Sequence, residues 1–214
     1  MNIADILPLL LIDAPECPDI VATNALISAT RDFCDQSNAW NEIQDPFTII
    51  DNTDIYDIDV PSDGLVVMVM DAWSPTYQLT GKSMEQISQL LPNWQKATGS
   101  QPIYFSSQPA SGEIRLFPMP LNAQRLQLTM RVSYKPTRTA TTIDDGLLDD
   151  YQDALLAGAR AKLMMQPGKA WSNPQLAQMN GQLFAREIVN ARITIDHDRA
   201  PGTIIARPAR PFGM

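Results

Sequence analysis

Residues 125–134 read RLQLTMRVSY, and apolar and polar side chains alternate along the whole stretch. A period of two is typical of a strand that buries one face, so the apolar side chains from Leu126 to Val132 are predicted to point inward. Further strands are predicted between turn signals upstream, over residues 55–60, 65–70, 102–105 and 113–117. The valine-rich stretch 65–70 is predicted to be a buried strand. The pattern favours a meander or small sandwich of antiparallel strands over residues 43–135.

Helices are predicted upstream of and within this β-rich region. Residues 18–37 open with Pro18 and Asp19, which suit the first turn of a helix. The same residues carry an apolar stripe with helical spacing, made of Ala22, Leu26, Ala29 and Phe33. Shorter helices are predicted over residues 1–12 and, with a serine cap, over residues 83–91.

Two helices are predicted downstream of the strands. The first covers residues 147–165 and ends at a Pro-Gly break, and the second begins at the cap Asn173 with Pro174 in its first turn. One side of the first helix carries small residues that let another helix approach closely: Ala154, Ala157, Gly158 and Ala161. The second helix is predicted to pack through an apolar stripe of Leu176, Met179, Leu183 and Ile188.

These elements together predict an α+β fold. We expect an α-helical core, a helix bundle of residues 1–42 and 136–196, into which an antiparallel β-sandwich-like lobe of residues 43–135 is inserted. Residues 197–214 contain three prolines and two glycines and show no periodicity. We therefore expect them to form an extended C-terminal arm.

Acidic residues are concentrated in the first third of the chain. The 214 residues have a formal net charge of −8, but residues 1–74 contain fourteen acidic residues and a single basic one, Arg31. Binding to DNA phosphates needs clustered lysine and arginine, so sequence-specific DNA binding is not expected. The longest apolar run, residues 65–70, is too short to cross a bilayer, and residues 1–12 lack the basic start of a secretory signal. We expect no membrane partner.

Two motifs that suggest enzyme chemistry are incomplete. Gly81-Lys82-Ser83 follows a strand, but Thr76 stands where a phosphate-binding loop needs a glycine. Cys17, Cys34 and the single histidine, His197, are too few for a zinc site or a disulfide scaffold. Neither motif predicts a bound nucleotide or metal.

Clustered aspartates leave one enzymatic alternative open. Two adjacent pairs, 144–145 and 149–150, lie at a helix start, and four more aspartates follow the first strands: Asp51, Asp54, Asp57 and Asp59. Converging carboxylates, together with His197, would suit a metal-dependent hydrolase. A helix start also favours negative charge, and the other four alternate outward along a strand. The favoured interpretation is structural, with no catalytic residue, no metal and no cofactor.

The order of the elements points to a family. The first long helix ends at Asn38-Ala39-Trp40 before a strand, and a later helix opens with Leu147-Leu-Asp-Asp-Tyr-Gln-Asp-Ala154. The last helix follows Ser172-Asn-Pro174 and is rich in Gln and Arg. In this layout the chain resembles the head-to-tail connector adaptor proteins of short-tailed bacteriophages, the tail tubular protein A type.

The resemblance implies a structural role in the virion, at the portal vertex and tail, after assembly in the host cytoplasm. It implies a ring of twelve copies assembled on the portal protein, with the helical part on the portal and the β-rich part toward the tail nozzle protein. Genomic DNA would pass through the channel without specific binding, and repeated negative charge in the channel agrees with that because it repels a polyanion. Another virion tail or neck component, such as a tail-completion protein or a baseplate subunit, is the alternative.

The C-terminal arm carries the candidate partner-binding residues. Its prolines disfavour helix and most sheet pairing, yet it holds apolar and arginine side chains of the kind that protein interfaces favour: Ile204, Ile205, Arg207, Arg210 and Phe212. We expect this arm to dock in extended form on the portal or on a neighbouring subunit.

Overall fold

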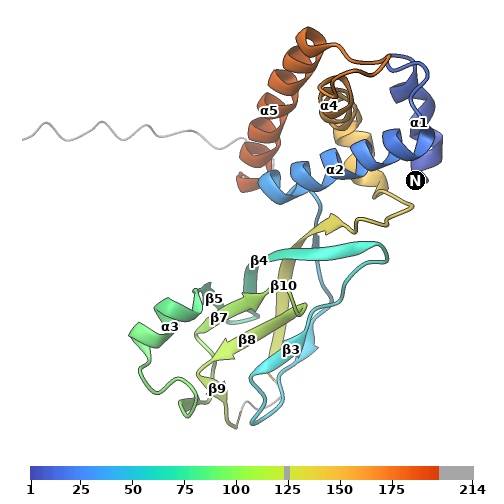
Figure 1. The fold of residues 1–214 in the computed structure, drawn as a ribbon. Helices are drawn as coiled ribbons and strands as arrows, with labels where there is room; N and C mark the ends of the chain where they lie inside the picture. Colours follow the sequence, from blue (N-terminus) through green and yellow to red (C-terminus); the bar gives the residue numbers. More distant parts are fainter. Residues whose placement is uncertain (123–125, 198–214) are drawn as a thin grey trace, which may run out of the picture.

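The chain forms five helices and ten strands in the computed structural model, which describes residues 1–122 and 126–197, and the fold is α+β as predicted (Figure 1). The helices are α1 (Ile3–Leu11), α2 (Asp19–Ser37), α3 (Met84–Leu90), α4 (Asp145–Met164) and α5 (Pro174–Asp196). The strands are β1 (Asn41–Ile43), β2 (Phe47–Thr48), β3 (Ile55–Asp57), β4 (Gly64–Ser74), β5 (Tyr77–Gly81), β6 (Thr98–Gly99), β7 (Tyr104–Gln108), β8 (Glu113–Phe117), β9 (Met119–Pro120) and β10 (Gln127–Pro136).

Four of the helices gather at one end of the molecule. The predicted stripe of α2 is buried against α4, α5 and α1, and its members are Ala22, Leu26, Ala29 and Phe33. The helix ends at Asn38, whose left-handed backbone (φ 55°) lets its N–H donate to the Cys34 carbonyl at 3.0 Å. Asn173 accepts a hydrogen bond from the Leu176 N–H at 3.1 Å and starts α5, as predicted.

The predicted small-residue side of α4 is a helix contact. A Cβ atom placed on Gly158 would lie 2.6 Å from the ring of Phe184, so only glycine lets α5 come this close. Gly181 on α5 faces Ala161 in return, with 3.9 Å between a placed Cβ and the alanine methyl group. The close approach of the two helices follows from these small residues.

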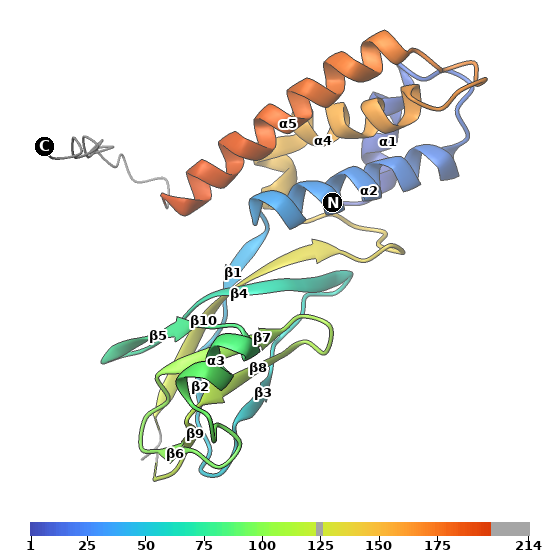
Figure 2. The ribbon, with the colours of Figure 1, turned by 60° about the vertical axis from the view of Figure 1, so that its left-hand side comes forward.

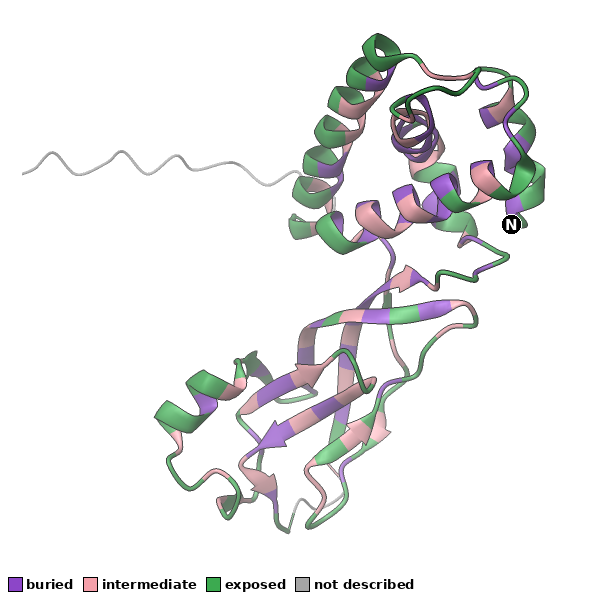
Figure 3. Cartoon of the chain, in the orientation of Figure 1, coloured by how far each residue is buried: buried purple, intermediate pink, exposed green. Residues whose placement is uncertain are grey.

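The predicted apolar stripe of α5 is wrong for three of its four residues. Only Ile188 is buried, whereas Leu176, Met179 and Leu183 are 42%, 60% and 36% exposed. Figure 3 shows that much of α5 is exposed. The helix packs instead through another stripe with helical spacing, made of Ala177, Gly181, Phe184, Ile188 and Ala191. The small side of α4 accommodates this stripe because its alanines and glycine leave room for the ring of Phe184. Leu176 and Leu183 lie on another side of α5 and stay exposed.

Most of the strands form one curled sheet in the order β1-β10-β4-β5-β7-β8-β3, with β2 added to the edge of β10. The neighbours are antiparallel except β5 and β7, which pair in parallel, as do β6 and β9 in a separate two-stranded sheet. The antiparallel prediction is therefore wrong for these two pairs. Parallel neighbours need a crossover connection, and the segment with α3 supplies it between β5 and β7.

The two longest strands, β4 and β10, pair with each other as the third and second strands of this order. The predicted alternation of β10 is confirmed from Leu128 to Val132, since Leu128, Met130 and Val132 are all buried, and it is wrong at Ser133, which is also buried beside a register shift. The prediction that residues 65–70 are buried is wrong in part, because Leu65 and Met68 are exposed whereas Val66 and Val69 are buried. One face of β4 therefore meets solvent.

The helical end and the sheet end share one buried core. Trp40 at the end of α2 packs on the ring of Tyr134 in β10, with 5.7 Å between ring centroids. One cluster of buried side chains includes residues of α1, α2, α4 and the central strands. Figures 1 and 2 show α1, α2, α4 and α5 at one end of an elongated molecule and the strands with α3 at the other. The division into a helical core and an inserted lobe stays a prediction.

Candidate interaction surfaces

The predicted partner-binding residues Ile204, Ile205, Arg207, Arg210 and Phe212 lie outside the described residues. The structure describes the helix that leads to them, α5, and its last residue is Asp196. His197 follows as an exposed cap residue whose N–H donates to the Ile193 carbonyl at 3.1 Å. The role of the arm stays a prediction.

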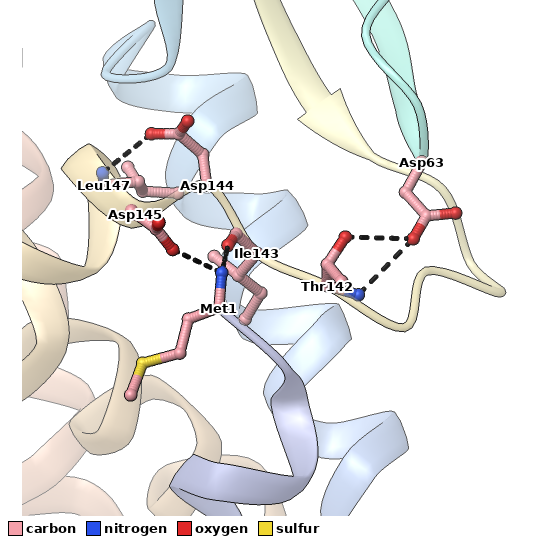
Figure 4. Close-up of polar contacts among 7 residues, drawn as sticks. All are labelled: Met1, Asp63, Thr142, Ile143, Asp144, Asp145 and Leu147. Atoms are coloured by element: carbon pink, nitrogen blue, oxygen red, sulfur yellow. Dashed lines mark hydrogen bonds and ion pairs between the residues drawn. The ribbon is translucent and has the colours of Figure 1, made fainter.

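Three aspartates of the enzymatic alternative have separate structural partners. Asp144 caps α4 by accepting a hydrogen bond from the Leu147 N–H at 2.9 Å, and Asp145 pairs with the N-terminal amine (Figure 4). Asp54 accepts from the Arg115 Nε at 2.6 Å on the sheet. Within residues 1–122 and 126–197, no three histidine, cysteine, aspartate or glutamate side chains come together as a metal site.

The Gly81-Lys82-Ser83 motif and the cysteines also serve packing and capping. Ser83 and Gln86 form a capping box at the start of α3, as the serine cap predicted. The Gly81 position faces the ring of Phe105. Cys34 is fully buried, and burial raises the pKa of its thiol to about 12, so this thiol is unreactive.

The linker between β10 and α4 is held by the sheet. The Asp63 carboxylate accepts four hydrogen bonds from Thr141 and Thr142, at 3.0 and 3.3 Å from their backbone N–H groups and at 3.2 and 3.1 Å from their hydroxyls. Figure 4 shows the two hydrogen bonds from Thr142. The hydrogen bond from the Thr141 N–H is the main cause that lowers the pKa of Asp63 below its ordinary value. The carboxylate therefore acts as a clasp between the β3–β4 loop and the linker.

The chain start holds the other side of the same linker. The Met1 amine donates to the Ile143 carbonyl at 2.8 Å, and the Ile143 N–H donates to the Met1 carbonyl at 3.0 Å. The Ile3 N–H adds a bond to the Thr141 carbonyl at 3.0 Å. Residues 141–143 thus connect the helical end to the sheet end through side chain and backbone contacts.

A groove lies between the first half of α4 and the middle of α5. Its α4 wall is residues 149–154, and its α5 wall is Leu183, Arg186 and Glu187. The wall of α4 includes a break in the helix at Tyr151 (φ −132°, ψ 16°), whose ring packs on Phe33 with 5.1 Å between centroids. We call this hollow the acidic groove because it holds Asp149, Asp150, Asp153 and Glu187 against one cation, Arg186.

An apolar stripe on α5 leads into the acidic groove. The exposed side chains of Leu176, Met179 and Leu183 follow one another at spacings of three and four, so they share one face of the helix. Leu183 belongs to both the stripe and the groove wall. The sequence offered a signal for the groove, since Asp149, Asp150 and Asp153 have the spacing of one helix side, but it did not show that α5 lies opposite.

A family model describes adaptor proteins and matches residues 1–209 of the chain. The chain belongs to the SU10 adaptor protein family. SU10 adaptor proteins form a phage head-tail adaptor family, so the resemblance to phage adaptors is confirmed at this level, and the tail tubular protein A type stays a prediction. None of the curated proteins matches the chain.

Membership of the SU10 adaptor family makes the protein a structural component of a phage virion that interacts with other head or tail proteins. Along the described part of the chain, no helix is long and apolar enough to span a membrane. The functional question for such a protein is which of its surfaces meet which neighbours.

Proposed function

We propose that this SU10 adaptor family member forms a ring between the portal protein and the tail nozzle protein of a phage, at the portal vertex, and that the genome passes through the ring. The ring has twelve copies and assembles on the portal in the host cytoplasm. The proposal assigns the protein no catalytic step and no cofactor. Its main support is the family match over residues 1–209.

The two-ended shape of the molecule supports this function. A helical end and a sheet end lie apart and present different surfaces (Figure 2). An adaptor needs such an arrangement because it binds one protein on the head side and another on the tail side. In the proposal the helical end meets the portal and the sheet end meets the nozzle.

The charge of the chain supports passage of DNA without retention. The first 74 residues carry fourteen acidic residues and one arginine, and that arginine, Arg31, donates a hydrogen bond to the Pro136 carbonyl. A channel that repeats this surface in every copy repels a polyanion. In the proposal, genomic DNA therefore passes through the channel without a specific binding site on the protein.

Ring closure requires different surfaces on the two sides of each copy. In the proposal the apolar stripe of α5 on one side and the C-terminal arm on the other make these contacts. We expect mostly monomer in isolation, because weak contacts become effective when a template places copies side by side.

Electron microscopy of the purified protein mixed with the purified portal protein, and of the same mixture with the tail proteins added, tests the proposal. We expect a ring on one end of the portal with the helical ends against it, whereas the protein alone shows monomers. Density on the nozzle or on another tail protein, with none on the portal, would instead favour a tail-completion role. A portal that stays bare in the presence of all tail components would refute the adaptor function.

A further inference from the structure

We propose that the acidic groove and the apolar stripe of one copy bind the C-terminal arm, residues 199–214, of the neighbouring copy. The inference rests on the proposed ring, and it names the surface that each copy offers to the next. The groove and stripe lie on described residues of α4 and α5. The arm is described by its amino-acid sequence alone.

The apolar stripe has no cover within the described part of the chain. Met179, at its centre, is 60% exposed, although methionine is a side chain that interfaces favour. The buried stripe on the other side of α5 already joins this helix to α4, so fold stability does not require Leu176, Met179 and Leu183 to be apolar. A segment bound over these three side chains explains why they are apolar.

The acidic groove holds more negative than positive charge, with four carboxylates and one arginine in its walls. Other carboxylates of the helical end have partners at short distance: Lys162 with Asp32 at 2.6 Å, Arg160 with Asp13 at 2.7 Å and Lys135 with Asp35 at 2.5 Å. Among the described residues, Asp149 and Asp153 have no ion-pair partner. Arg186, the only cation in the groove wall, pairs with Glu187 at 3.1 Å.

The arm is complementary to this surface in charge and in polarity. Residues 199–214 contain three arginines, Arg199, Arg207 and Arg210, and no acidic residue. Arginine binds carboxylates through paired hydrogen bonds, which makes these contacts stronger than neutral ones. The apolar side chains of Ile204 and Ile205 would pack on the apolar stripe.

The order and the length of the two segments also match. The stripe and groove extend from Leu176 to Glu187, which is about 16 Å along a helix at 1.5 Å per residue. Residues 204–210 span about 20 Å when extended. In the arm, Ile204 and Ile205 precede Arg207 and Arg210. Along α5, the apolar stripe likewise precedes the acidic groove.

A neighbouring copy is the source of the arm because a ring joins its copies head to tail. Each copy then needs a donor surface and a different acceptor surface. The basic arm and the acidic groove form such a pair on one chain. Every copy gives its arm to one neighbour and receives the arm of the other.

A peptide with the sequence of residues 199–214, labelled with a fluorophore at its N-terminus, is the probe. Fluorescence anisotropy with the full-length protein is expected to show saturable binding that weakens as salt is added. Asp149→Asn with Asp153→Asn should weaken binding about tenfold or more, since two charged contacts are lost. Met179→Ser should also weaken it.

Two matched variants control for general effects. Asp57→Asn with Asp59→Asn removes the same charge from the sheet end, and Val189→Ser truncates an α5 side chain that is 56% exposed on another side of the helix. Both should bind the peptide like the wild type. Equal loss in the groove variant and in the sheet variant would refute a specific site, as would the absence of any binding to the wild type.

A truncated protein of residues 1–198 separates the neighbour's arm from the chain's own arm. If each arm occupied its own groove, the peptide would bind the truncated protein about a hundredfold more tightly than the full chain, because the tethered arm competes at high effective concentration. The proposal expects the two affinities to agree within about threefold. The peptide experiment contains no portal, so a negative result in it would not contradict the adaptor function. A bare portal in the electron microscope would likewise not contradict the contact between arm and groove.

Discussion

The ring of Phe184 on α5 lies directly over Gly158 on α4, at a distance that leaves no space for a side chain at position 158. Gly158→Ala should therefore destabilise the protein by about 1–3 kcal/mol, since the ring or the helix must shift. Urea unfolding followed by circular dichroism measures this change. Gly181→Ala is the matched control, because the nearest atom to the new methyl group is 3.9 Å away. It should be neutral or stabilising, since alanine favours a helix. Equal destabilisation by both substitutions would contradict the close contact.

The clasp made by Asp63 predicts a dependence of stability on pH. Hydrogen bonds from Thr141 and Thr142 lower the pKa of this carboxyl below its ordinary value. The ionised carboxylate therefore contributes stability above the ordinary pKa, and this contribution is lost as the pH falls through the lowered pKa. Asp63→Ala should lower the melting temperature at pH 7, and the difference from the wild type should shrink in strongly acidic buffer.

Thermal melts of both proteins between pH 2 and pH 7 test this expectation. Asp57→Ala controls for the loss of one surface carboxylate from the same region of the sheet. A difference between wild type and Asp63→Ala that stays constant over the whole range would show that the titration of Asp63 is not linked to folding.

The cap at the start of α4 predicts small effects for conservative changes. Asp144 accepts a hydrogen bond from the Leu147 N–H, and asparagine caps a helix almost as well as aspartate. Asp144→Asn with Asp149→Asn should cost at most about 1 kcal/mol of stability through the helix dipole, and Asp144→Asn alone should leave attachment to the portal nearly intact. Asp144→Ala should cost about 1 kcal/mol because the cap is lost. A metal-dependent activity that disappears in the double Asn variant would favour the hydrolase alternative.

Deletion of residues 199–214 should separate assembly from stability. The packed helices and strands lie within the described residues, so the melting temperature of the free protein should not change. Attachment to the portal should be abolished or greatly weakened if the arm docks on the portal or on a neighbouring copy. Co-sedimentation with the portal measures this, and attachment equal to that of the full chain would rule out the arm as an anchor.

Local signals predicted many of the elements. The structure confirms three signals that depend on residues close in sequence. They are the cap Asn173 with Pro174, the serine cap at Ser83 and the alternation of β10 from Leu128 to Val132. These signals act within one turn of a helix or along one strand, so no knowledge of the tertiary structure is needed.

The faces that elements present to one another were harder to predict. Two stripes on α5 both have helical spacing, and Gly158, on another helix, decides that Phe184 rather than Leu183 is turned toward α4. The acidic groove was missed for the same reason, since its second wall comes from α5. The parallel pairing of β5 with β7 depends on how the segment with α3 crosses over, which no strand pattern records.

The helices and the sheet are joined by two chain crossings that lie side by side. Asn41 of β1 pairs with Ser133 of β10, and the Tyr134 N–H donates to the Trp40 carbonyl at 2.8 Å. Two adjacent crossings resist stretching but bend easily about one axis, as a hinge does. The clasp from Asp63 to Thr141 and Thr142 joins the β3–β4 loop to the linker that forms the second crossing, so it braces the joint against that bending. A load on the sheet end would therefore reach the helical end through the paired backbones and the clasp.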